Sequence, residues 1–255
     1  MCTVTVIQLE GGGFRLVTNR DESPDRPAAT QPEWHEGIAG SADGARALWP
    51  TDGLAGGTWV AAGEHGLALT LLNGNLGDRA VLPDPTRRQS RGILIPRLIG
   101  CPDALATHDA LAGFELDRFE PFRLVAADAA EGLRIVESFW DGRSLQTTDL
   151  GSGPACFASS GLGDEQVQPR IPLFAELVVA AGPTPAAQDR FHCHQWPDRP
   201  EISVLMERAE ARTVSITGVE VRPTGEGRFE VSMAALGSSS LRDDSSETRP
   251  RRAVL

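Results

Sequence analysis

The chain has 255 residues, of which 40% are hydrophobic and 23% are charged. This composition excludes a chain that is wholly disordered or embedded in a membrane, and the length allows one large layered domain or two smaller ones. A formal charge of −11 argues against nucleic acid as a partner, because the phosphate backbone would be repelled. The sequence contains no lysine and no tyrosine, which excludes a lysine Schiff base, a P-loop lysine and a tyrosine general acid.

Short, locally paired strands dominate the predicted elements. The first hairpin joins residues 3–9 to 14–19 across a glycine-rich turn at 10–13. Further strands are expected at 59–62, 67–73, 122–127, 133–139, 219–222 and 228–233. Helices are expected at 86–98 and 103–111, as a broken helical hairpin, at 172–181, which opens with proline, and with a weaker pattern at 200–211.

The order of hairpins, then helices, then hairpins predicts an α+β sandwich built on antiparallel sheets. Residues 1–236 are expected to form a single domain. The remaining residues, 237–255, are rich in Ser, Arg, Asp and Glu and are expected to be a disordered tail. The sequence does not indicate an oligomeric state.

The four cysteines do not form a CxxC motif or an even spacing, so a disulfide framework is not indicated. The N-terminus lacks the basic and apolar regions of a signal peptide, and no window approaches 18 apolar residues, so no membrane span is expected. We therefore expect a cytoplasmic protein with reduced thiols. Abundant Ala, Gly, Arg and Asp without Lys is typical of a GC-rich bacterial genome.

Cys2 is the first candidate for chemistry. A small residue at position two usually permits removal of Met1, which would leave a cysteine with a free α-amine. The thiol has an ordinary pKa near 8.5 and the amine one of about 7.7 to 8.0, so the amine can take the thiol proton near neutral pH. Cys2 would then carry its own base. From its position alone, a cysteine that is merely tolerated after methionine is the simpler interpretation.

The first hairpin brings charged residues to Cys2. If its turn has the residues 10–13, the register places Cys2 opposite Asp21, with Arg20 next to it. An arginine can stabilise a thiolate, and an aspartate can hold and orient an ammonium group. A register shifted by one residue would exchange the two, and the tetrapeptide 19–22 alone would also fit a solvated strand end.

Specifically spaced motifs fill the first part of the chain. They are Met1-Cys2-Thr3, then Asn19-Arg20-Asp21-Glu22 with Arg26-Pro27-Ala28, and Gly56-Gly57-Thr58-Trp59-Val60 leading to Leu71-Leu72-Asn73. Together they resemble the NRDE family, which includes the transport-and-Golgi-organisation proteins. The likeness is strong up to residue 75, and residues 91–98, 159–161 and 212–215 match more loosely.

The resemblance implies a four-layer αββα sandwich, the fold of the N-terminal-nucleophile hydrolases, with penicillin V acylase and bile-salt hydrolase as chemical models. Carried over by motif, Cys2 is the nucleophile, Arg20 the partner of its thiolate and Asp21 the residue that orients the amine. Asn73 would donate its side-chain N–H to the oxyanion, and Arg212 would be the late arginine of the site. No metal ion or organic cofactor is implied.

Two positions depart from the family pattern. Where the amidases supply a second asparagine, this chain has Ser159-Ser160-Gly161, so that donor is replaced by a hydroxyl or backbone group or is missing. Arg212 matches the late arginine only loosely. Asn73, which precedes Gly74, also fits an ordinary turn residue.

The tripeptide His192-Cys193-His194 contains metal-ligand residue types. On an extended strand the two histidines would share a face, but no third or fourth ligand lies at a workable spacing. We therefore predict a polar loop here and no metal site.

The leading functional hypothesis is a cysteine amidohydrolase that cleaves a linear C–N amide bond of a small N-acyl substrate through a thioester. The alternative, also implied by the resemblance, is a non-catalytic protein that binds or transports haem or a lipid or acyl-CoA ligand. In both cases the partner is a small molecule with an acyl or apolar part. A fold kept only as an interaction module is a third hypothesis.

Overall fold

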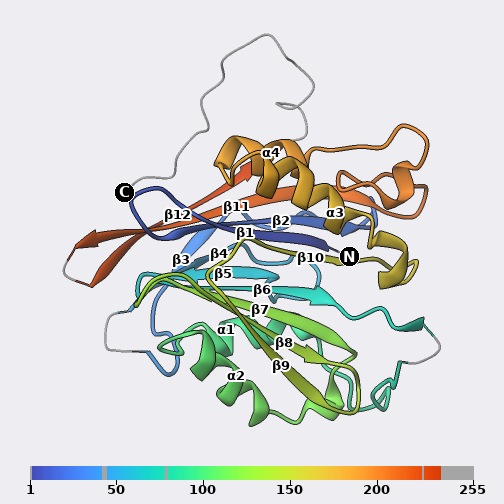
Figure 1. Ribbon diagram of the computed structural model, residues 1–255. Helices are drawn as coiled ribbons and strands as arrows, with labels where there is room; N and C mark the ends of the chain where they lie inside the picture. Colours follow the sequence, from blue (N-terminus) through green and yellow to red (C-terminus); the bar gives the residue numbers. More distant parts are fainter. Residues whose placement is uncertain (1, 42–44, 78–79, 226, 237–255) are drawn as a thin grey trace.

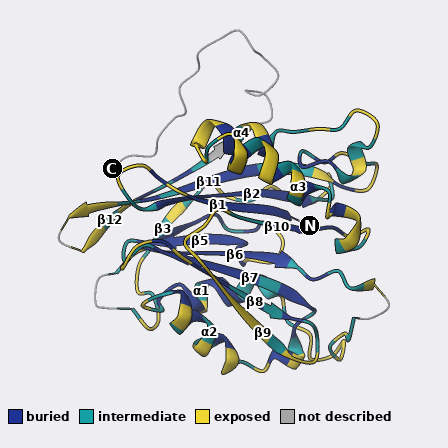
Figure 2. Ribbon diagram, viewed as in Figure 1, coloured by how far each residue is buried: buried dark blue, intermediate teal, exposed yellow. Residues whose placement is uncertain are grey.

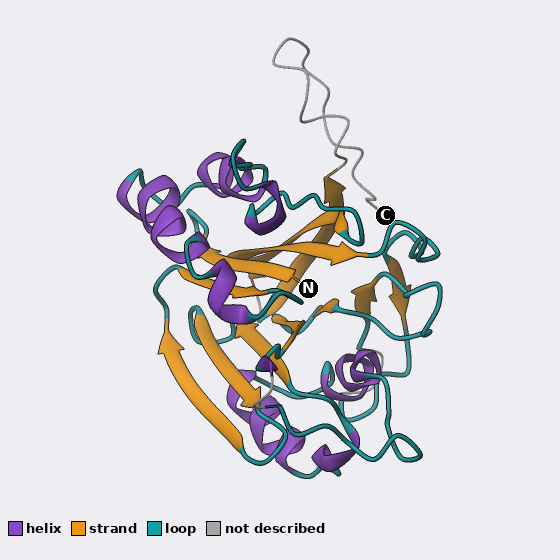
Figure 3. Cartoon of the chain, turned by 90° about the vertical axis from the view of Figure 1, so that its right-hand side faces the viewer, coloured by secondary structure: helices purple, strands orange, loops and turns teal. Residues whose placement is uncertain are grey.

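The computed structural model describes residues 2–41, 45–77, 80–225 and 227–236, and it shows two antiparallel sheets packed face to face (Figure 1). The helices α3 (Arg170–Phe174) and α4 (Pro185–His192) cover the outer face of one sheet, and α1 (Leu94–Leu98) and α2 (Ala104–Ala112) cover that of the other. The view in Figure 3 shows the same layers from the side. The predicted αββα sandwich is thus confirmed. The tail predicted at 237–255 lies outside the described residues.

The first sheet, called sheet A here, has the strand order β10-β1-β2-β11-β12. Its strands are β1 (Cys2–Gln8), β2 (Phe14–Glu22), β10 (Ala155–Ser159), β11 (Arg212–Gly225) and β12 (Arg228–Leu236). β1 and β2 therefore lie inside the sheet and pair on both sides. Both predicted hairpins of this sheet are confirmed, although β11 begins earlier than expected.

The second sheet, called sheet B here, has the order β3-β4-β5-β6-β7-β8-β9. Its strands are β3 (Glu33–His35), β4 (Ala47–Trp49), β5 (Val60–Gly63), β6 (Leu67–Asn73), β7 (Phe122–Asp128), β8 (Arg134–Trp140) and β9 (Leu145–Gly151). The sequence predicted β5 to β8, and it did not predict the short strands β3 and β4 or the exposed strand β9.

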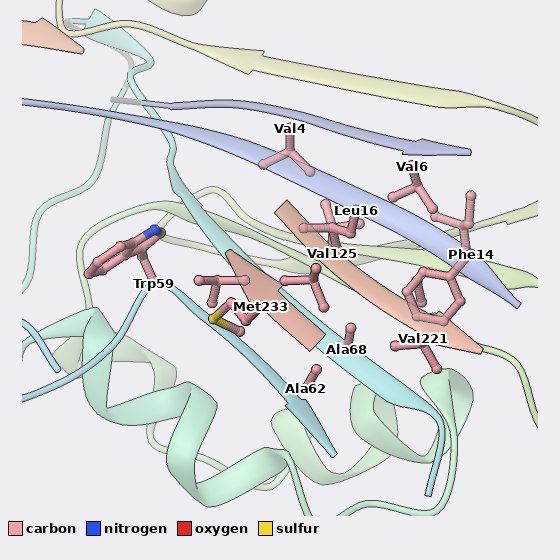
Figure 4. Close-up of a cluster of buried hydrophobic side chains, with 14 of the residues drawn as sticks. Val4, Val6, Phe14, Leu16, Trp59, Ala62, Ala68, Val125, Val221 and Met233 are labelled. Carbon is pink, nitrogen blue, oxygen red and sulfur yellow. The ribbon is translucent and has the colours of Figure 1, made fainter. Parts of the chain in front are cut away.

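Three apolar clusters hold the layers together. The largest lies between the sheets and includes Val4, Phe14, Leu16, Val125 and Val221 (Figure 4). A second cluster joins sheet B to α1 and α2, and a third joins sheet A to α3 and α4. The inner strands of both sheets are accordingly buried along most of their length, whereas the edge strand β9 and the outer sides of the helices are exposed (Figure 2). Cys2 belongs to the cluster between the sheets.

The register of the first hairpin differs by one residue from the prediction. Cys2 pairs with Arg20, and Gln8 pairs with Phe14, so the loop spans 9–13 and not 10–13. The N–H of Gly12 donates to the carbonyl of Leu9 at 3.1 Å, and three consecutive glycines with positive φ complete the loop. Such a conformation favours glycine, and a Cβ on Gly13 would lie 2.0 Å from the carbonyl oxygen of Val221.

The helix predicted at 103–111 is confirmed as α2, and the other helices differ from the prediction. The helix expected at 86–98 is only the 3₁₀ turn Arg91–Ile93 followed by α1, because Asp84 accepts hydrogen bonds from the N–H and hydroxyl of Thr86 at 2.8 and 2.7 Å and holds a turn there. Further 3₁₀ turns lie at Leu116–Arg118, Asp164–Val167 and Pro200–Ile202. The helix expected at 172–181 begins as α3 and continues as a π-helix, Ala175–Ala180.

The helix expected at 200–211 is wrong beyond its first turn. The buried side chain of Arg170 donates to the carbonyls of Ile202 (3.0 Å) and Ser203 (2.6 Å), and Asn19 donates to the carbonyl of Val204 (2.8 Å). These carbonyls therefore bind side chains of other elements and not the N–H groups of a helix. Within the described part of the chain, no helix is both long and apolar enough to cross a membrane.

Candidate functional site

Cys2 lines a hollow of about 180 Å³, called the central hollow here, to which both sheets contribute. The polar side chains that line it with Cys2 are Arg20, Glu22, Arg26, Asp52, Asn73 and Arg91. The structure thus brings together three of the predicted site residues, Cys2, Arg20 and Asn73. It places Cys2 and Arg20 on β1 and β2, the neighbouring strands of a hairpin in sheet A, and Asn73 on β6 of sheet B.

Cys2 lies between Arg20 on β2 and Ser159 on β10, each directly opposite it in the sheet. Directly opposed residues of antiparallel strands point to the same face and have Cβ atoms about 4.5 to 5.5 Å apart. The hydroxyl of Ser159 is fully buried and has no hydrogen-bond partner among the described residues. A hydroxyl therefore lies beside Cys2 in the segment where the resemblance expected an asparagine.

Arg20 is held in place by contacts on two sides. Its guanidinium donates to Asp52 and lies over the ring of Trp59, with Cζ 4.6 Å from the ring centroid. Asp52 also accepts from Arg26 at 2.9 and 3.0 Å and from the backbone N–H of Ala55 at 2.7 Å. Although burial opposes it, these hydrogen bonds keep the pKa of Asp52 below its ordinary value. Asp52 is therefore an ionised anchor that fixes the two arginines.

The thiol of Cys2 has a raised pKa. Burial is the main cause, and the nearby charge of Arg20 acts in the opposite direction. At neutral pH the thiol is therefore protonated until a base removes its proton. A free α-amine on the same residue is the base that this arrangement calls for.

Asp21 points to the other face of sheet A, toward the helices. It is buried, and it accepts a hydrogen bond from the hydroxyl of Thr213 at 2.6 Å. Since Cys2 pairs with Arg20, Asp21 lies one residue further along β2, level with the backbone nitrogen of Cys2. Its predicted role in orienting the amine remains a prediction. Burial raises the pKa of Asp21, and the charge of Arg170 acts against that shift.

Arg170 supports this side of the site from α3. It is 1% exposed, the largest fully buried side chain of the described residues, and it donates to the hydroxyl of Thr3 at 2.6 Å. Thr3 follows Cys2 directly, so Arg170 ties the start of β1 to the helix layer. The positive charge of the arginine lowers the pKa of Asp21, against the larger effect of burial, which raises it.

Asn73 and Arg91 form the wall of the central hollow opposite sheet A. Asn73 is the last residue of β6, where it pairs with Phe122. Arg91 donates to the carbonyl of Pro121 at 2.9 Å and lies 3.3 Å from the carboxylate of Glu120. Burial lowers the pKa of Arg91, and the charge of Glu120 acts against that shift.

The glycine-rich block before Trp59 has a packing reason. A Cβ on Gly57 would lie 2.5 Å from the carbonyl carbon of Gly92, and the N–H of Thr58 donates to the carbonyl of Gly92 at 3.0 Å. Only glycine permits this close approach of two backbones. The contact brings Arg91 next to the segment that carries Trp59. The glycine-rich block thus positions two residues that line the central hollow.

Arg212 does not line the central hollow. It is exposed at the start of β11, opposite Glu22, and lines a neighbouring hollow that also includes Arg20, Arg26 and Trp59. Its predicted role in the site remains a prediction. Arg91 supplies a guanidinium in the central hollow itself.

Sequence reasoning missed Asp52, Arg91 and Arg170 as parts of the site. Asp52 precedes Gly53 in a turn, where its carboxylate accepts hydrogen bonds from backbone N–H groups. In the sequence, Asp followed by Gly predicts a turn and does not indicate a functional residue. Arg91 opens a stretch that matched the family only loosely. For Arg170 no local signal exists, because its partners Thr3 and Asp21 are far away in sequence.

The histidine tripeptide is not a polar loop. His192 ends α4 and is fully buried, with Nδ1 2.5 Å from Oδ1 of Asn19 and Nε2 2.6 Å from the hydroxyl of Thr5. His194 stacks edge to face on Trp196. The extended strand that would have aligned the two histidines is a helix end, and no three potential ligands gather around a metal position in the part of the chain described.

Comparisons with known proteins agree with this architecture. The sequence model of the Transport and Golgi organisation 2 family matches residues 1–168. A search of curated protein sequences found no match. Among solved structures, an N-acylethanolamine-hydrolyzing acid amidase ortholog from Caenorhabditis elegans is similar, with 14% identity and a TM-score of 0.54 over 85% of this chain and 92% of that chain.

Two further solved structures share the arrangement at lower scores. Penicillin V acylase from Agrobacterium tumefaciens has 13% identity and a TM-score of 0.49, over 92% of this chain and 83% of that chain. A C2A mutant of conjugated bile acid hydrolase from Clostridium perfringens has 11% identity and a TM-score of 0.48, over 98% and 96%. At such identities the likeness concerns the fold, which is that of the N-terminal-nucleophile hydrolases.

Proposed function

The chain belongs to the Transport and Golgi organisation 2 family, and on that premise we propose that it is an N-terminal cysteine amidohydrolase. Its substrate is a small linear N-acyl amide, whose C–N bond it cleaves through a thioester. The observation that carries the proposal is the convergence of Cys2, Arg20 and Asn73, from three strands, on one hollow. The fold shared with an N-acylethanolamine-hydrolyzing amidase ortholog supports the same reaction class.

The reaction requires that Met1 be removed. The α-amine of Cys2 then takes the thiol proton, and Sγ attacks the carbonyl carbon of the amide. The negative charge that develops on the carbonyl oxygen is stabilised by the side-chain N–H of Asn73. When the C–N bond breaks, the leaving amine takes the proton from the Cys2 ammonium and the acyl group stays on Sγ as a thioester.

Hydrolysis of the thioester repeats these steps with water. The α-amine accepts a proton from the water, whose oxygen attacks the thioester carbonyl, and Sγ leaves as the acid is released. Arg20 stabilises the thiolate at both stages, because it lies directly opposite Cys2 and is fixed by Asp52. Asp21 orients the amine from the other face of the sheet.

The second candidate function is non-catalytic binding of haem or of a lipid or acyl-CoA ligand. The raised pKa of the Cys2 thiol favours it, because a neutral thiol in a hollow can contact a ligand without attacking it. In that case Cys2 would line the binding site and Asp21 would have no chemical role.

The first test is the mass of the N-terminal peptide, before and after brief treatment with a substoichiometric thiol electrophile. We expect Met1 to be absent and Cys2 to be labelled ahead of the other cysteines. Burial raises the pKa of Cys101, Cys156 and Cys193 as well, that of Cys193 to about 11, so preferential labelling of Cys2 would require a local base. A retained Met1 would contradict the hydrolase mechanism.

The second test is turnover of N-acyl amides, run beside titration with haem and with a fatty acid. Turnover that is lost on Asp21→Asn supports the hydrolase, because the amine loses the carboxylate that orients it. Saturable haem or fatty-acid binding that survives Asp21→Asn, without turnover, supports the carrier.

A further inference from the structure

The central hollow continues into a larger hollow on each side. One, of about 350 Å³ and called the apolar hollow here, shares Arg20, Arg26 and Trp59 with it. The other, of about 380 Å³ and called the loop hollow here, shares Asn73 and Arg91 with it. Cys2 thus lies in the middle of a trough that extends in two directions.

The central hollow alone is too small for a complete N-acyl amide. Its volume of about 180 Å³ equals roughly six water molecules at about 30 Å³ each. A carbonyl carbon at Sγ of Cys2 carries two substituents, the acyl chain and the amine, which diverge from it. The acyl chain must therefore enter one neighbouring hollow and the amine the other.

The two neighbouring hollows differ in chemistry. Apolar residues make up the larger part of the apolar hollow, namely Pro24, Pro27, Ala28, Ala29, Pro32, Pro50, Trp59 and Val214, and its polar lining comes from Arg20, Arg26, Arg212, Thr30, Gln31, Ser215 and Thr217. The loop hollow is mixed: Asn73, Asn75, Arg91, Glu120 and glycine backbone line it together with Leu76, Leu82 and Leu162. Burial of an alkyl chain is favourable only against apolar walls, and each buried methylene tightens binding by about fourfold.

The apolar hollow is also preformed. Prolines fix the backbone of the segment 24–32, and Thr30 anchors it through two hydrogen bonds of 2.9 Å with the backbone of Thr51. A Cβ on Gly53 would lie 2.4 Å from the carbonyl oxygen of Ala28, so the segment packs tightly on the neighbouring loop. A rigid apolar wall binds a flexible chain without losing its own conformational freedom.

From this geometry we propose that the apolar hollow binds the acyl chain of the substrate and the loop hollow its amine part. A volume of about 350 Å³ accommodates roughly ten heavy atoms. The substrate class is therefore an N-acyl amide with an apolar acyl chain of medium length and a polar amine. The inference rests on the proposed function, since it takes Cys2 as the point of cleavage.

The test uses one substitution at two positions on opposite sides of Cys2. Ala28→Phe narrows the apolar hollow and Ala80→Phe narrows the loop hollow. We compare kcat/KM for octanoyl and acetyl 4-nitroanilide, which share one leaving group. In Ala28→Phe the octanoyl-to-acetyl ratio falls by about tenfold or more, the equivalent of two or three lost methylene contacts. In Ala80→Phe both substrates slow alike and the ratio stays as in the wild type.

A ratio that is unchanged in Ala28→Phe, or that falls equally in Ala80→Phe, overturns the proposal. Val214→Phe, on the opposite wall of the apolar hollow and 39% exposed, serves as a second variant should Ala28→Phe fail to fold. Melting curves of each variant establish that it is folded.

Binding separates this proposal from the proposed function. In a Cys2→Ala background, displacement of a dansyl-labelled fatty acid by octanoate reports the apolar hollow without turnover. Octanoate binding that weakens by about tenfold on Ala28→Phe and not on Ala80→Phe supports the subsite even if no amide is hydrolysed. If amides are turned over but the affinity for octanoate is the same in Ala28→Phe as in the parent, the acyl subsite is contradicted. The proposed hydrolase function is not affected by that result.

Discussion

The two faces of sheet A differ in chemistry although they belong to the same strands. Toward sheet B, β1 and β2 present Cys2, Val4, Phe14, Leu16 and Arg20, an apolar core that ends at the central hollow. Toward the helices, the alternating residues of the same strands are polar except for Ile7 and Val17. The polar ones are Thr3, Thr5, Arg15, Asn19 and Asp21, all buried.

This difference divides the site into a reacting side and a positioning side. The hydrogen bonds of the helix-facing side come from Arg170 on α3 and from Gln188 and His192 on α4. They fix the start of β1 without lining the central hollow, and the hydroxyl of Thr213 holds the carboxylate of Asp21. Substitutions of the side chains that line the central hollow should therefore change chemistry with little change in stability, and substitutions of the polar side chains facing the helices should change stability first.

The largest effect is expected for Cys2→Ala on the reacting side. Loss of the thiol removes the nucleophile, and amide turnover should fall by about a thousandfold or more. The melting temperature should change little, because only the sulfur atom is lost. Turnover of a chromogenic N-acyl amide and a melting curve check both statements.

Cys156→Ala is the matched control for this substitution. Cys156 lies on β10 and packs against the cluster beneath the helices, so its thiol belongs to the positioning side. It should retain turnover and labelling of Cys2. If Cys156→Ala removed turnover as fully as Cys2→Ala, the division between the two faces would be wrong.

On the positioning side, Arg170→Met should have the largest effect. It leaves the hydroxyl of Thr3 and the carbonyls of Ile202 and Ser203 without their buried donor, at about 1 to 3 kcal/mol of unfolding free energy for each group. Urea denaturation measures this loss. In addition, the pH profile of Cys2 alkylation should shift, because Asp21 loses the positive charge that opposes the rise of its pKa.

Arg15→Met is the matched control for Arg170→Met. Arg15 is also buried on the helix-facing side, but it pairs with Asp189 and Glu220, whose side chains are 37% and 29% exposed and stay solvated when the arginine is lost. It should destabilise less and leave the alkylation profile of Cys2 unchanged. Equal shifts in both variants would show that Arg170 acts only through overall stability.

The contrast between Arg170 and Cys2 also shows how far the sequence could predict this site. Alternation and turn residues predicted the strands near Cys2, Arg20 and Asn73, because those signals are local. The predicted register was wrong by one residue at the glycine-rich loop. Glycines with positive φ allow loops of different length there, and the hydrophobic pattern of the strands does not distinguish these lengths.

The positioning side was beyond such reasoning. Arg170 donates to Thr3 and to carbonyls near Ser203, and these partners are brought together only by the packing of α3 on sheet A. Because these hydrogen bonds engage the carbonyls near Ser203, the helix expected at 200–211 does not form beyond its first turn. His192 was read as a loop residue because polar residue types predict exposure, whereas here they are buried together and satisfy one another.

A smaller loss is expected for Asn73→Ala, on the sheet B wall of the central hollow. Removal of one oxyanion donor typically lowers kcat by about 100- to 1,000-fold. The donor acts on the carbonyl oxygen and not on the thiol, so the rate at which Cys2 is alkylated should stay the same. A slower alkylation together with unchanged kcat would assign Asn73 to the thiol and contradict its proposed role.

The smallest expected effect concerns His192 and pH. Burial, together with the charges of Arg15 and Arg170, lowers the pKa of His192 well below its ordinary value, so the folded protein holds it neutral. The unfolded chain protonates it near pH 6.5. Its contribution is therefore present above about pH 6.5 and is lost as the pH falls, at up to about 1.4 kcal/mol per pH unit.

Urea denaturation at pH 7.5, 6.5 and 5.5 measures this slope, and His192→Gln provides the comparison. Glutamine has an amide that can bond Asn19 or Thr5 but cannot titrate, so the variant should be less stable than the wild type at pH 7.5 and should lose less stability between pH 6.5 and 5.5. The difference between the two slopes isolates His192 from the carboxylates that titrate in both proteins. Parallel slopes would mean that His192 is protonated in the folded protein, and the helix-facing network would then carry one more positive charge next to Arg170.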